Sequence, residues 1–334
     1  MTAMAPRGLL DLATFLAPRK AQIAARVTAQ GRRPAVEDFD RQGHTLSPAE
    51  REALDRWYET GLATSVVEEA RSADGTVRMV IGLHDGKRVE TVAMPVGAVC
   101  VSSQVGCAVG CRFCASGMYG VERHLDAEEI VEQVVHARRR MPIERIVYMG
   151  MGEPSHNLDN VLEAVARLKH EAGIGPRRQT LSTVGSLRAF ERMAEAEVQP
   201  CLAMSLHCAD EARRRELLPR AHKDPLRELV AGADAYGRSV GMPVQFEWTL
   251  LDGVNDSLAD GDALVDLLQG VRGYVNFIVW NRVADLPFAA PPRDRIVELV
   301  RHVKARGILA TIRDSSGADA EAACGQLRLR RAAT

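Results

Sequence analysis

The sequence predicts an α/β protein whose larger part is a partial (βα)6 barrel, preceded by a small helical domain and a β-hairpin. From about residue 97 onward, short apolar runs alternate with longer helical patterns, which favours βαβ units and a parallel sheet. Before that point, polar helical patterns give way to two β-rich runs. The chain has 334 residues, 46% of them hydrophobic, so it can bury one large core and a smaller appendage without disulfides.

Residues 1–75 are predicted to form a helical accessory domain. Helical patterns cover Leu9–Phe15, Lys20–Thr28 and Pro48–Thr60. The last of these follows Ser47, which begins a capping-box arrangement with Glu50. Residues 76–96 are predicted to be a β-hairpin connector, because two β-rich runs flank an Asp-Gly turn.

Residues 97–315 are predicted to be the barrel, and residues 316–334 a C-terminal segment that carries Cys324. Six apolar runs are the predicted strands: Ala98–Val101, Arg145–Met149, Gln179–Thr183, Cys201–Leu206, Val244–Leu250 and Val275–Val279. In such a barrel, functional residues lie at the carboxyl ends of the strands. The polar residues in or just after these runs are therefore candidates for a site.

Composition excludes several classes of protein. The net charge is −1, with 43 basic and 44 acidic residues, so the whole-chain charge gives no support to a nucleic-acid partner. Neither a secretory signal nor an apolar run of about 18 residues is present, which predicts a cytoplasmic protein without a membrane span. Seven cysteines, three of them crowded together, favour reduced thiols over a disulfide framework.

Those three crowded cysteines, Cys107, Cys111 and Cys114, follow the first predicted barrel strand with spacings of three and two residues. Three thiolates in one loop can bind three corners of a [4Fe–4S] cluster and leave the fourth iron open. A structural zinc would want a fourth protein ligand, and none lies within the loop. An open iron suits chelation of S-adenosylmethionine (SAM) and its reductive cleavage to a 5′-deoxyadenosyl radical.

The second predicted strand ends in a glycine-rich turn, Gly150–Pro154. Glycine allows the backbone to approach a ligand closely, so Gly152 is a candidate for contact with SAM. The carboxylate of Glu153 can pair with the SAM amino group.

Several motifs together closely resemble the RlmN/Cfr family of radical SAM methyltransferases, and the RlmN branch most of all. The resemblance runs in order from about residue 64 to residue 328. The segments that carry it are Cys100–Cys107, Gly150–Pro154, Leu181–Thr183, Ser205–His207, Trp280–Asn281 and Ala322–Leu327.

The resemblance implies methylation of an adenine ring carbon, C2, in 23S rRNA, with tRNA as a further substrate of the RlmN branch. Two SAM molecules would be used per turnover. Cys324 would take a methyl group from one SAM, and a thiomethylene radical formed on it would add to the adenine. Glu90 would then act as the base, and Cys100 would attack the sulfur of Cys324 to free the product and leave a disulfide.

The resemblance also implies a set of SAM contacts: Gly152, Glu153, Ser182, Ser205, Leu206, His207 and Asn281. It implies an RNA-binding accessory domain and a reductant such as flavodoxin or ferredoxin, and a monomer is the simplest expectation. The N-terminal 60 or so residues diverge from the aromatic opening typical of the family, and Cys208 stands where the family usually has alanine.

Three alternatives stay open on sequence alone. The same mechanism could act at adenine C8 or on another RNA or nucleotide. A different radical SAM reaction would not need Cys324. A non-catalytic RNA-binding protein with zinc at the three cysteines would be colourless and indifferent to the loss of Cys324.

Overall fold

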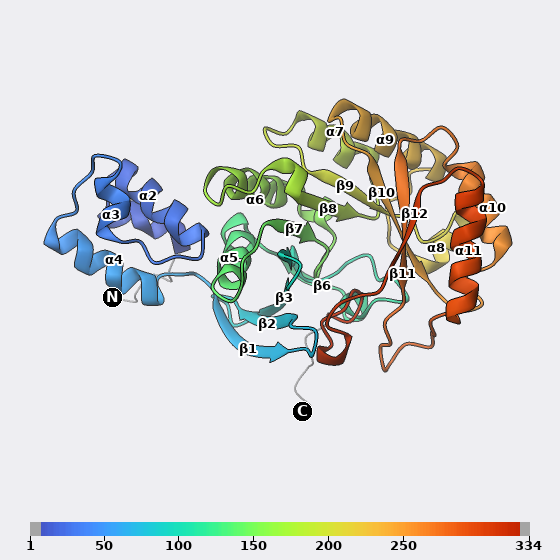
Figure 1. The fold of residues 1–334 in the computed structure, drawn as a ribbon, viewed down its shortest axis with the longest axis horizontal. Coiled ribbons are helices and arrows are strands. Elements are labelled where there is room, and N and C mark those ends of the chain that lie inside the picture. Colours follow the sequence, from blue (N-terminus) through green and yellow to red (C-terminus); the bar gives the residue numbers. More distant parts are fainter. Residues whose placement is uncertain (1–7, 328–334) are drawn as a thin grey trace.

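A ten-stranded mixed sheet runs through the protein in the order β1-β2-β3-β4-β7-β8-β9-β10-β11-β12 (Figure 1). The computed structural model describes residues 8–327. Strands β1 to β4 pair antiparallel, and every pair from β4 to β12 is parallel. The strands of this sheet are β1 (Ser65–Arg71), β2 (Val77–Gly82), β3 (Arg88–Met94), β4 (Ala98–Cys100), β7 (Arg145–Tyr148), β8 (Gln179–Thr183), β9 (Cys201–Ser205), β10 (Val244–Leu250), β11 (Gly273–Val279) and β12 (Ala310–Arg313).

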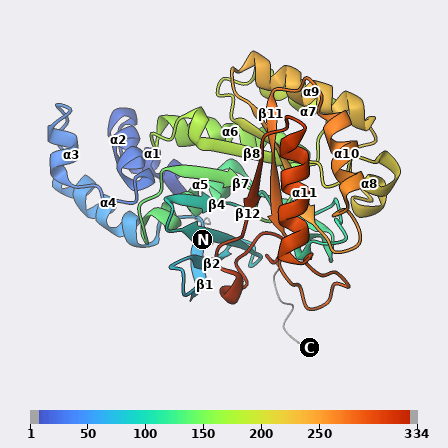
Figure 2. The same cartoon turned by 45° about the vertical axis from the view of Figure 1, so that its right-hand side comes forward.

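Because β1 and β12 lie at opposite ends of this order, the described sheet is an open, partial barrel. The predicted α/β class and partial barrel are therefore confirmed. Figures 1 and 2 show helices along the outer side of the curved sheet. The barrel helices are α5 (Ala127–Arg138), α6 (Leu158–His170), α7 (Leu187–Glu195), α8 (Glu211–Leu217), α9 (Leu226–Ser239), α10 (Leu258–Leu267) and α11 (Arg293–Ala305).

The N-terminal helical unit packs against the barrel through α5. Its helices are α1 (Leu12–Phe15), α2 (Pro18–Ala29), α3 (Val36–Asp40) and α4 (Pro48–Thr60), and Ser47 caps α4 with the predicted capping box. Two buried glutamates of α5 receive the contacts from this unit: Glu128 accepts the Leu9 amide at 2.6 Å, and Glu132 accepts the Thr64 amide at 2.8 Å. None of the helices within residues 8–327 is long and apolar enough to cross a membrane.

Four strands have no counterpart among the predicted elements: the two of a separate small sheet, described below, and two in the main sheet. Strand β1 (Ser65–Arg71) lies inside the range predicted to be helical, and it extends the predicted hairpin into a three-stranded antiparallel segment of the main sheet. Strand β12 (Ala310–Arg313) adds a seventh parallel strand after the six that were predicted. Both strands are short or polar, with exposed positions along them, so their apolar signal is weak.

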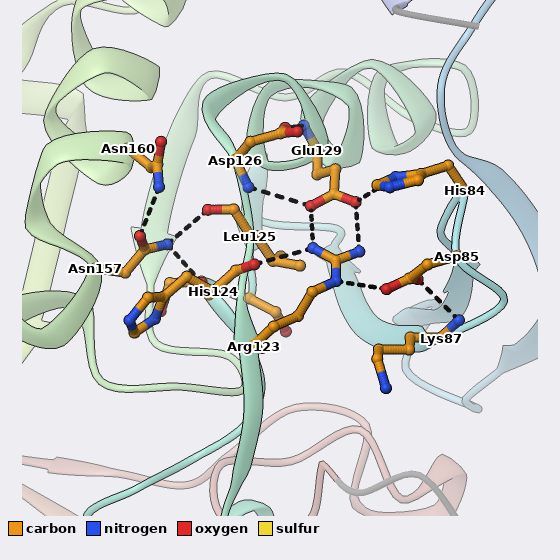
Figure 3. A network of polar contacts seen from close by, with 12 residues as sticks. His84, Asp85, Lys87, Arg123, His124, Leu125, Asp126, Glu129, Asn157 and Asn160 are labelled. Atoms are coloured by element: carbon orange, nitrogen blue, oxygen red, sulfur yellow. Dashed lines mark hydrogen bonds and ion pairs between the residues drawn. The ribbon is translucent and has the colours of Figure 1, made fainter. Parts of the chain in front are cut away.

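A separate two-stranded sheet, β5 (Gln104–Gly106) with β6 (Val121–His124), frames the loop of three cysteines. Arg123 of β6 holds this sheet against α5 through two bonds of 2.8 Å to the Glu129 carboxylate (Figure 3). The same guanidinium binds Asp85 in the hairpin turn at 2.7 Å. The loop therefore begins and ends on an element fixed to the rest of the barrel.

Candidate active site

A cavity of about 140 Å³ lies where the carboxyl ends of the parallel strands meet the C-terminal segment. Cysteines, serines, a histidine and two glutamates contribute most of its polar lining. The lining residues are Cys107, Val109, Cys111, Phe113, Cys114, Ser116, Tyr148, Met149, Gly150, Gly152, Glu153, Ser182, Val184, Ser205, His207, Glu247, Thr249, Ile278, Trp280, Cys324 and Gly325.

The three cysteines of the loop all face this one cavity. Burial raises the pKa of the Cys107 thiol to about 12 and raises those of Cys111 and Cys114. The Cys114 thiol raises the pKa of both Cys107 and Cys111 further, and the Cys324 thiol raises that of Cys114. As thiolates, the three cysteines would repel one another, and a positively charged centre between them would stabilise all three. The donor set therefore fits an iron–sulfur cluster.

A mononuclear metal does not fit the same place. Zinc–sulfur bonds of about 2.3 Å bring the thiolates of a zinc site within about 4 Å of each other. Within residues 8–327, no group of three or more His, Cys, Asp or Glu side chains is arranged to hold a single metal ion. The structural-zinc alternative accordingly loses its geometric basis in the described chain.

The Gly150–Pro154 turn enters the cavity through its backbone and through Glu153. Gly152 has φ of +108°, and a Cβ there would lie 2.7 Å from the Gln104 amide nitrogen. Glu153 is buried, and its carboxylate accepts the Thr183 hydroxyl at 2.5 Å and the Val184 amide at 3.1 Å. The turn is thus closely packed, and Glu153 joins the ends of β7 and β8.

The predicted SAM contacts from β8 and β9 also reach the cavity. Ser182 and Ser205 lie side by side, with 3.4 Å between their hydroxyl oxygens. His207 has φ of +59°, and its Nδ1 accepts the Thr249 amide at 3.0 Å, so Nε2 carries the proton of the neutral ring. Burial lowers the pKa of His207 to about 3, which keeps the ring neutral.

Leu206 and Asn281 are not part of the cavity lining. Leu206 is fully buried, and its carbonyl accepts the Arg214 Nε at 3.0 Å. Asn281 Nδ2 donates to the Cys324 carbonyl at 3.1 Å and to the Ser315 hydroxyl at 2.9 Å. Asn281 therefore holds the C-terminal segment beside the cavity.

Cys324 lines two cavities at once. Besides the larger one, it lines a cavity of about 20 Å³ together with Cys100 and Arg313. Burial raises the pKa of Cys100 to about 12, the nearby Cys324 thiol adds to this rise, and the positive charge of Arg313 opposes it. The structure thus brings the two predicted cysteines to one place, and all seven cysteines of the chain are free.

Glu90 is not among the residues that line either cavity. It is buried in β3, and its carboxylate pairs with Arg78 at 2.5 Å. Alternation along the strand puts it on the same face as Val92 and Met94, which do line the smaller cavity. Glu90 therefore lies close to Cys100 and Cys324 in the fold, but its carboxylate pairs with Arg78.

Three charged residues of this region were missed by the sequence analysis. Glu247 is a buried carboxylate in an otherwise mostly apolar strand, a signal that could have found it, and it lines the larger cavity. Arg214 is buried and donates hydrogen bonds to the carbonyls of Leu206, Val184 and Ser205. It therefore links the carboxyl ends of β8 and β9. Arg313 ends β12, the strand that the sequence did not reveal.

The sequence pattern of the radical SAM superfamily matches residues 101–261 of this chain. A protein of Stutzerimonas stutzeri named "Probable RNA methyltransferase" is 48% identical over 262 residues, which cover 78% of this chain and 77% of that protein. The chain belongs to the radical SAM superfamily. An Azoarcus relative, also named a probable RNA methyltransferase, is 44% identical over 91% of this chain and 86% of its own length.

A solved structure is similar to this chain over nearly its full length. The crystal structure of a radical SAM methyltransferase from Sphaerobacter thermophilus is 38% identical, with a TM-score of 0.85, and the match covers 98% of this chain and 99% of that one. Superfamily membership implies a [4Fe–4S] cluster and SAM. Cys107, Cys111 and Cys114 are the residues whose chemistry suits the cluster.

Proposed function

We propose that this radical SAM protein is an RNA methyltransferase that methylates C2 of an adenine in 23S rRNA, with tRNA as a second substrate. One observation carries the proposal: Cys324 lines the cavity of the three cluster cysteines and also the cavity of Cys100. A thiol placed between those two sites can carry a carbon group from one to the other. The names of the relatives support the assignment to RNA.

When bound at these residues, the cluster and SAM supply a carbon radical by one-electron cleavage, and the proposal requires two SAM molecules per turnover. A radical is needed because adenine C2 is a poor nucleophile. The nucleophile toward the SAM methyl group is instead a sulfur: the Cys324 Sγ attacks the methyl carbon of one SAM, and S-adenosylhomocysteine leaves.

Cys100 completes the reaction in this proposal. The adduct radical first gives up the ring proton and one electron, which returns to the electron carrier. The Cys100 thiolate then attacks the Cys324 sulfur and a disulfide joins the two cysteines. The carbon–sulfur bond breaks with its electron pair on the product carbon, which takes up a proton to become the methyl group. Arg313 lies where its charge favours the thiolate form of Cys100. Glu90 is proposed as the base that removes the ring proton, and Glu90→Gln is then expected to leave RNA covalently joined to Cys324.

The protein would need RNA and an electron donor as partners. We propose a flavodoxin- or ferredoxin-type reductant, because the cluster requires single electrons. Hydrogen bonds from Leu9 and Thr64 to α5 join the helical unit to the barrel that holds the cavity, which suits a unit that holds RNA.

The deciding experiment is mass spectrometry of nucleosides from rRNA and tRNA of cells that lack this protein. Wild type is expected to restore 2-methyladenosine, and Cys324→Ala is expected not to. Cys201→Ala is the matched control, because the Cys201 thiol lies away from both cavities beside Met242. Restoration of 8-methyladenosine would move the ring position to C8, and restoration by Cys324→Ala would refute the methylcysteine route.

A further inference from the structure

A second cleft, of about 570 Å³, lies outside the barrel next to the cysteine loop. Histidines, arginines and serines supply most of its polar lining. The lining residues are Gln104, Ala108, Val121, His124, Ser155, His156, Leu158, Ser186, Arg188, Ala189, Arg192 and His222. This set contains no carboxylate, although acidic residues make up a large part of the chain.

Several hydrogen-bond donors in the cleft have no acceptor within residues 8–327. The Ser155 hydroxyl is buried without a hydrogen-bond partner. Arg188 is exposed, and its guanidinium makes no hydrogen bond or ion pair to the described residues. His156 and His222 contact each other ring to ring, with centroids 5.1 Å apart. An unpartnered hydroxyl and a free guanidinium in one cleft favour an acceptor-rich ligand.

The bonding of Gln104 fixes the tautomer of His124. Gln104 Oε1 accepts the Glu153 amide at 2.7 Å, so its Nε2 is the donor to His124 Nδ1 at 2.9 Å. The neutral His124 ring then carries its proton on Nε2, which makes it another donor. Figure 3 shows that this ring points away from the Arg123 guanidinium, on the opposite side of β6.

Nearby acids do not line the cleft, although the charge of Glu153 reaches it: burial lowers the pKa of His156, and Glu153 opposes this. Asp159 pairs with Arg192, and Asp224 accepts the Leu187 amide at 3.2 Å at the start of α7. Neither carboxylate is among the lining residues. The described residues also contain no group of three His, Cys, Asp or Glu arranged for a metal ion, so the three histidines are not a metal site.

We propose that this cleft binds a phosphate group, through Arg188, the Ser155 hydroxyl and the imidazoles of His124, His156 and His222. At neutral pH the oxygens of a phosphate are hydrogen-bond acceptors, apart from the one that carries its titrating proton. Such a group matches a cleft whose lining supplies hydrogen-bond donors and no carboxylate. The group is either a backbone phosphate of RNA or a free phosphate or phosphorylated small molecule. Only the RNA source rests on the proposed function.

The first test uses the full chain with its cluster, labelled with ¹³C at the histidine Cε1 position, and titrates inorganic phosphate. The signals of His156 and His222, assigned with His156→Gln and His222→Gln, are expected to shift and saturate. Arg188→Gln should weaken this binding about tenfold, because one charge-assisted hydrogen bond is lost. Arg301→Gln, which removes an exposed charge on α11, should leave it unchanged.

Three results of that titration would overturn the proposal: no saturable shift at His156 and His222, an equal shift at the exposed His170, or equal phosphate affinity in Arg188→Gln. Because no turnover is involved, these failures are distinct from the absence of a methylated nucleoside. Unchanged thermal unfolding of the variants ensures that the comparison is made between folded proteins.

The second test separates the two sources of phosphate. It measures the affinity of the same variants for a single-stranded RNA of about 16 nucleotides by fluorescence anisotropy at fixed salt. Weaker RNA binding by Arg188→Gln than by Arg301→Gln supports a backbone phosphate as the occupant. Equal RNA affinity, combined with weakened phosphate binding, supports a free phosphate or phosphorylated small molecule.

Discussion

The backbone amide of Ala115 donates a hydrogen bond of 2.8 Å to the carbonyl oxygen of Gly325. Ala115 directly follows the last cluster cysteine and Gly325 directly follows Cys324, so one bond joins the cysteine loop to the C-terminal segment. The Ser116 hydroxyl adds a second bond, of 2.7 Å, to the Leu327 carbonyl. The position of Cys324 therefore depends on the cysteine loop.

Ser116→Ala should uncouple SAM cleavage from methylation. The variant loses the buried hydrogen bond to the Leu327 carbonyl, worth about 1 kcal/mol. It also loses the side-chain hydrogen bond that lowers the pKa of Cys114 against the effect of burial, so occupancy of the cluster is measured alongside the products. The cluster cysteines are unchanged, so formation of 5′-deoxyadenosine is expected to persist while methylated RNA falls. Both products can be measured from one reaction by mass spectrometry.

Ser239→Ala is the matched control, because its hydroxyl also donates to a backbone carbonyl, that of Tyr236 in α9. It should keep the wild-type ratio of methylated RNA to 5′-deoxyadenosine. An unchanged ratio in Ser116→Ala would show that the bond to Leu327 does not position Cys324.

Gly152→Ala should weaken SAM binding. Its φ of +108° is unfavourable for alanine, and the new Cβ would lie 2.6 Å from the Ser103 hydroxyl, so the turn before Glu153 must move. Equilibrium binding of SAM to protein with its cluster measures the effect, which we expect to exceed about tenfold.

Gly173→Ala separates the two causes, because Gly173 also has positive φ but has no atom within 4 Å of an added Cβ. It should lose stability and keep its affinity for SAM. If Gly152→Ala binds SAM as wild type does, the turn does not form part of the SAM site.

The residues of the larger cavity could be predicted from the sequence better than those around it. The cysteine spacing and the strand-end residues Glu153, Ser205 and His207 were predicted, because each lies within or beside a strongly apolar run. Arg313 was missed because β12 has only one buried apolar residue, Ala310, and so gives a weak apolar signal. The approach of Cys324 to Cys100 came from the family resemblance, since a contact across 224 positions of sequence leaves no periodic signal.

Arg313→Met should make Cys100 less reactive. The arginine is the positive charge that lowers the pKa of Cys100 against the effect of burial, so its removal raises that pKa further. Each unit of increase reduces the thiolate about tenfold at a given pH below the pKa. The rate of Cys100 alkylation by iodoacetamide between pH 8 and pH 10, followed by peptide mass spectrometry, measures the change.

Arg293→Met is the control, because Arg293 pairs with the exposed Asp314 near the same strand and lines neither cavity. Its alkylation profile should overlay that of wild type. Overlay of the Arg313→Met profile as well would remove Arg313 from any role in activating the cysteine.

His136→Gln should remove a loss of stability that the wild type suffers on acidification. His136 Nε2 lies 3.0 Å from the Thr64 hydroxyl, which itself donates to Glu132 at 2.6 Å, so the ring is the donor to that oxygen. Burial, with Arg139 and Arg140 nearby, lowers the pKa of His136 to about 3. The unfolded chain, with a histidine pKa near 6.5, thus binds the proton first, and stability is lost as pH falls below about 6.5.

Burial also raises the pKa of Glu132, to about 8, so its contribution to the unfolding free energy changes with pH in the opposite direction between about pH 4.5 and pH 8. Because Glu132 is present in both proteins, the difference in unfolding free energy between wild type and His136→Gln isolates the effect of the histidine. That difference, measured in urea, should fall by about 1.4 kcal/mol per pH unit between pH 6 and pH 5. His170→Gln, at an exposed histidine paired with Glu197, should show far less change. A constant difference from pH 7 to pH 5 would mean that His136 is protonated as readily in the folded protein as in the unfolded chain.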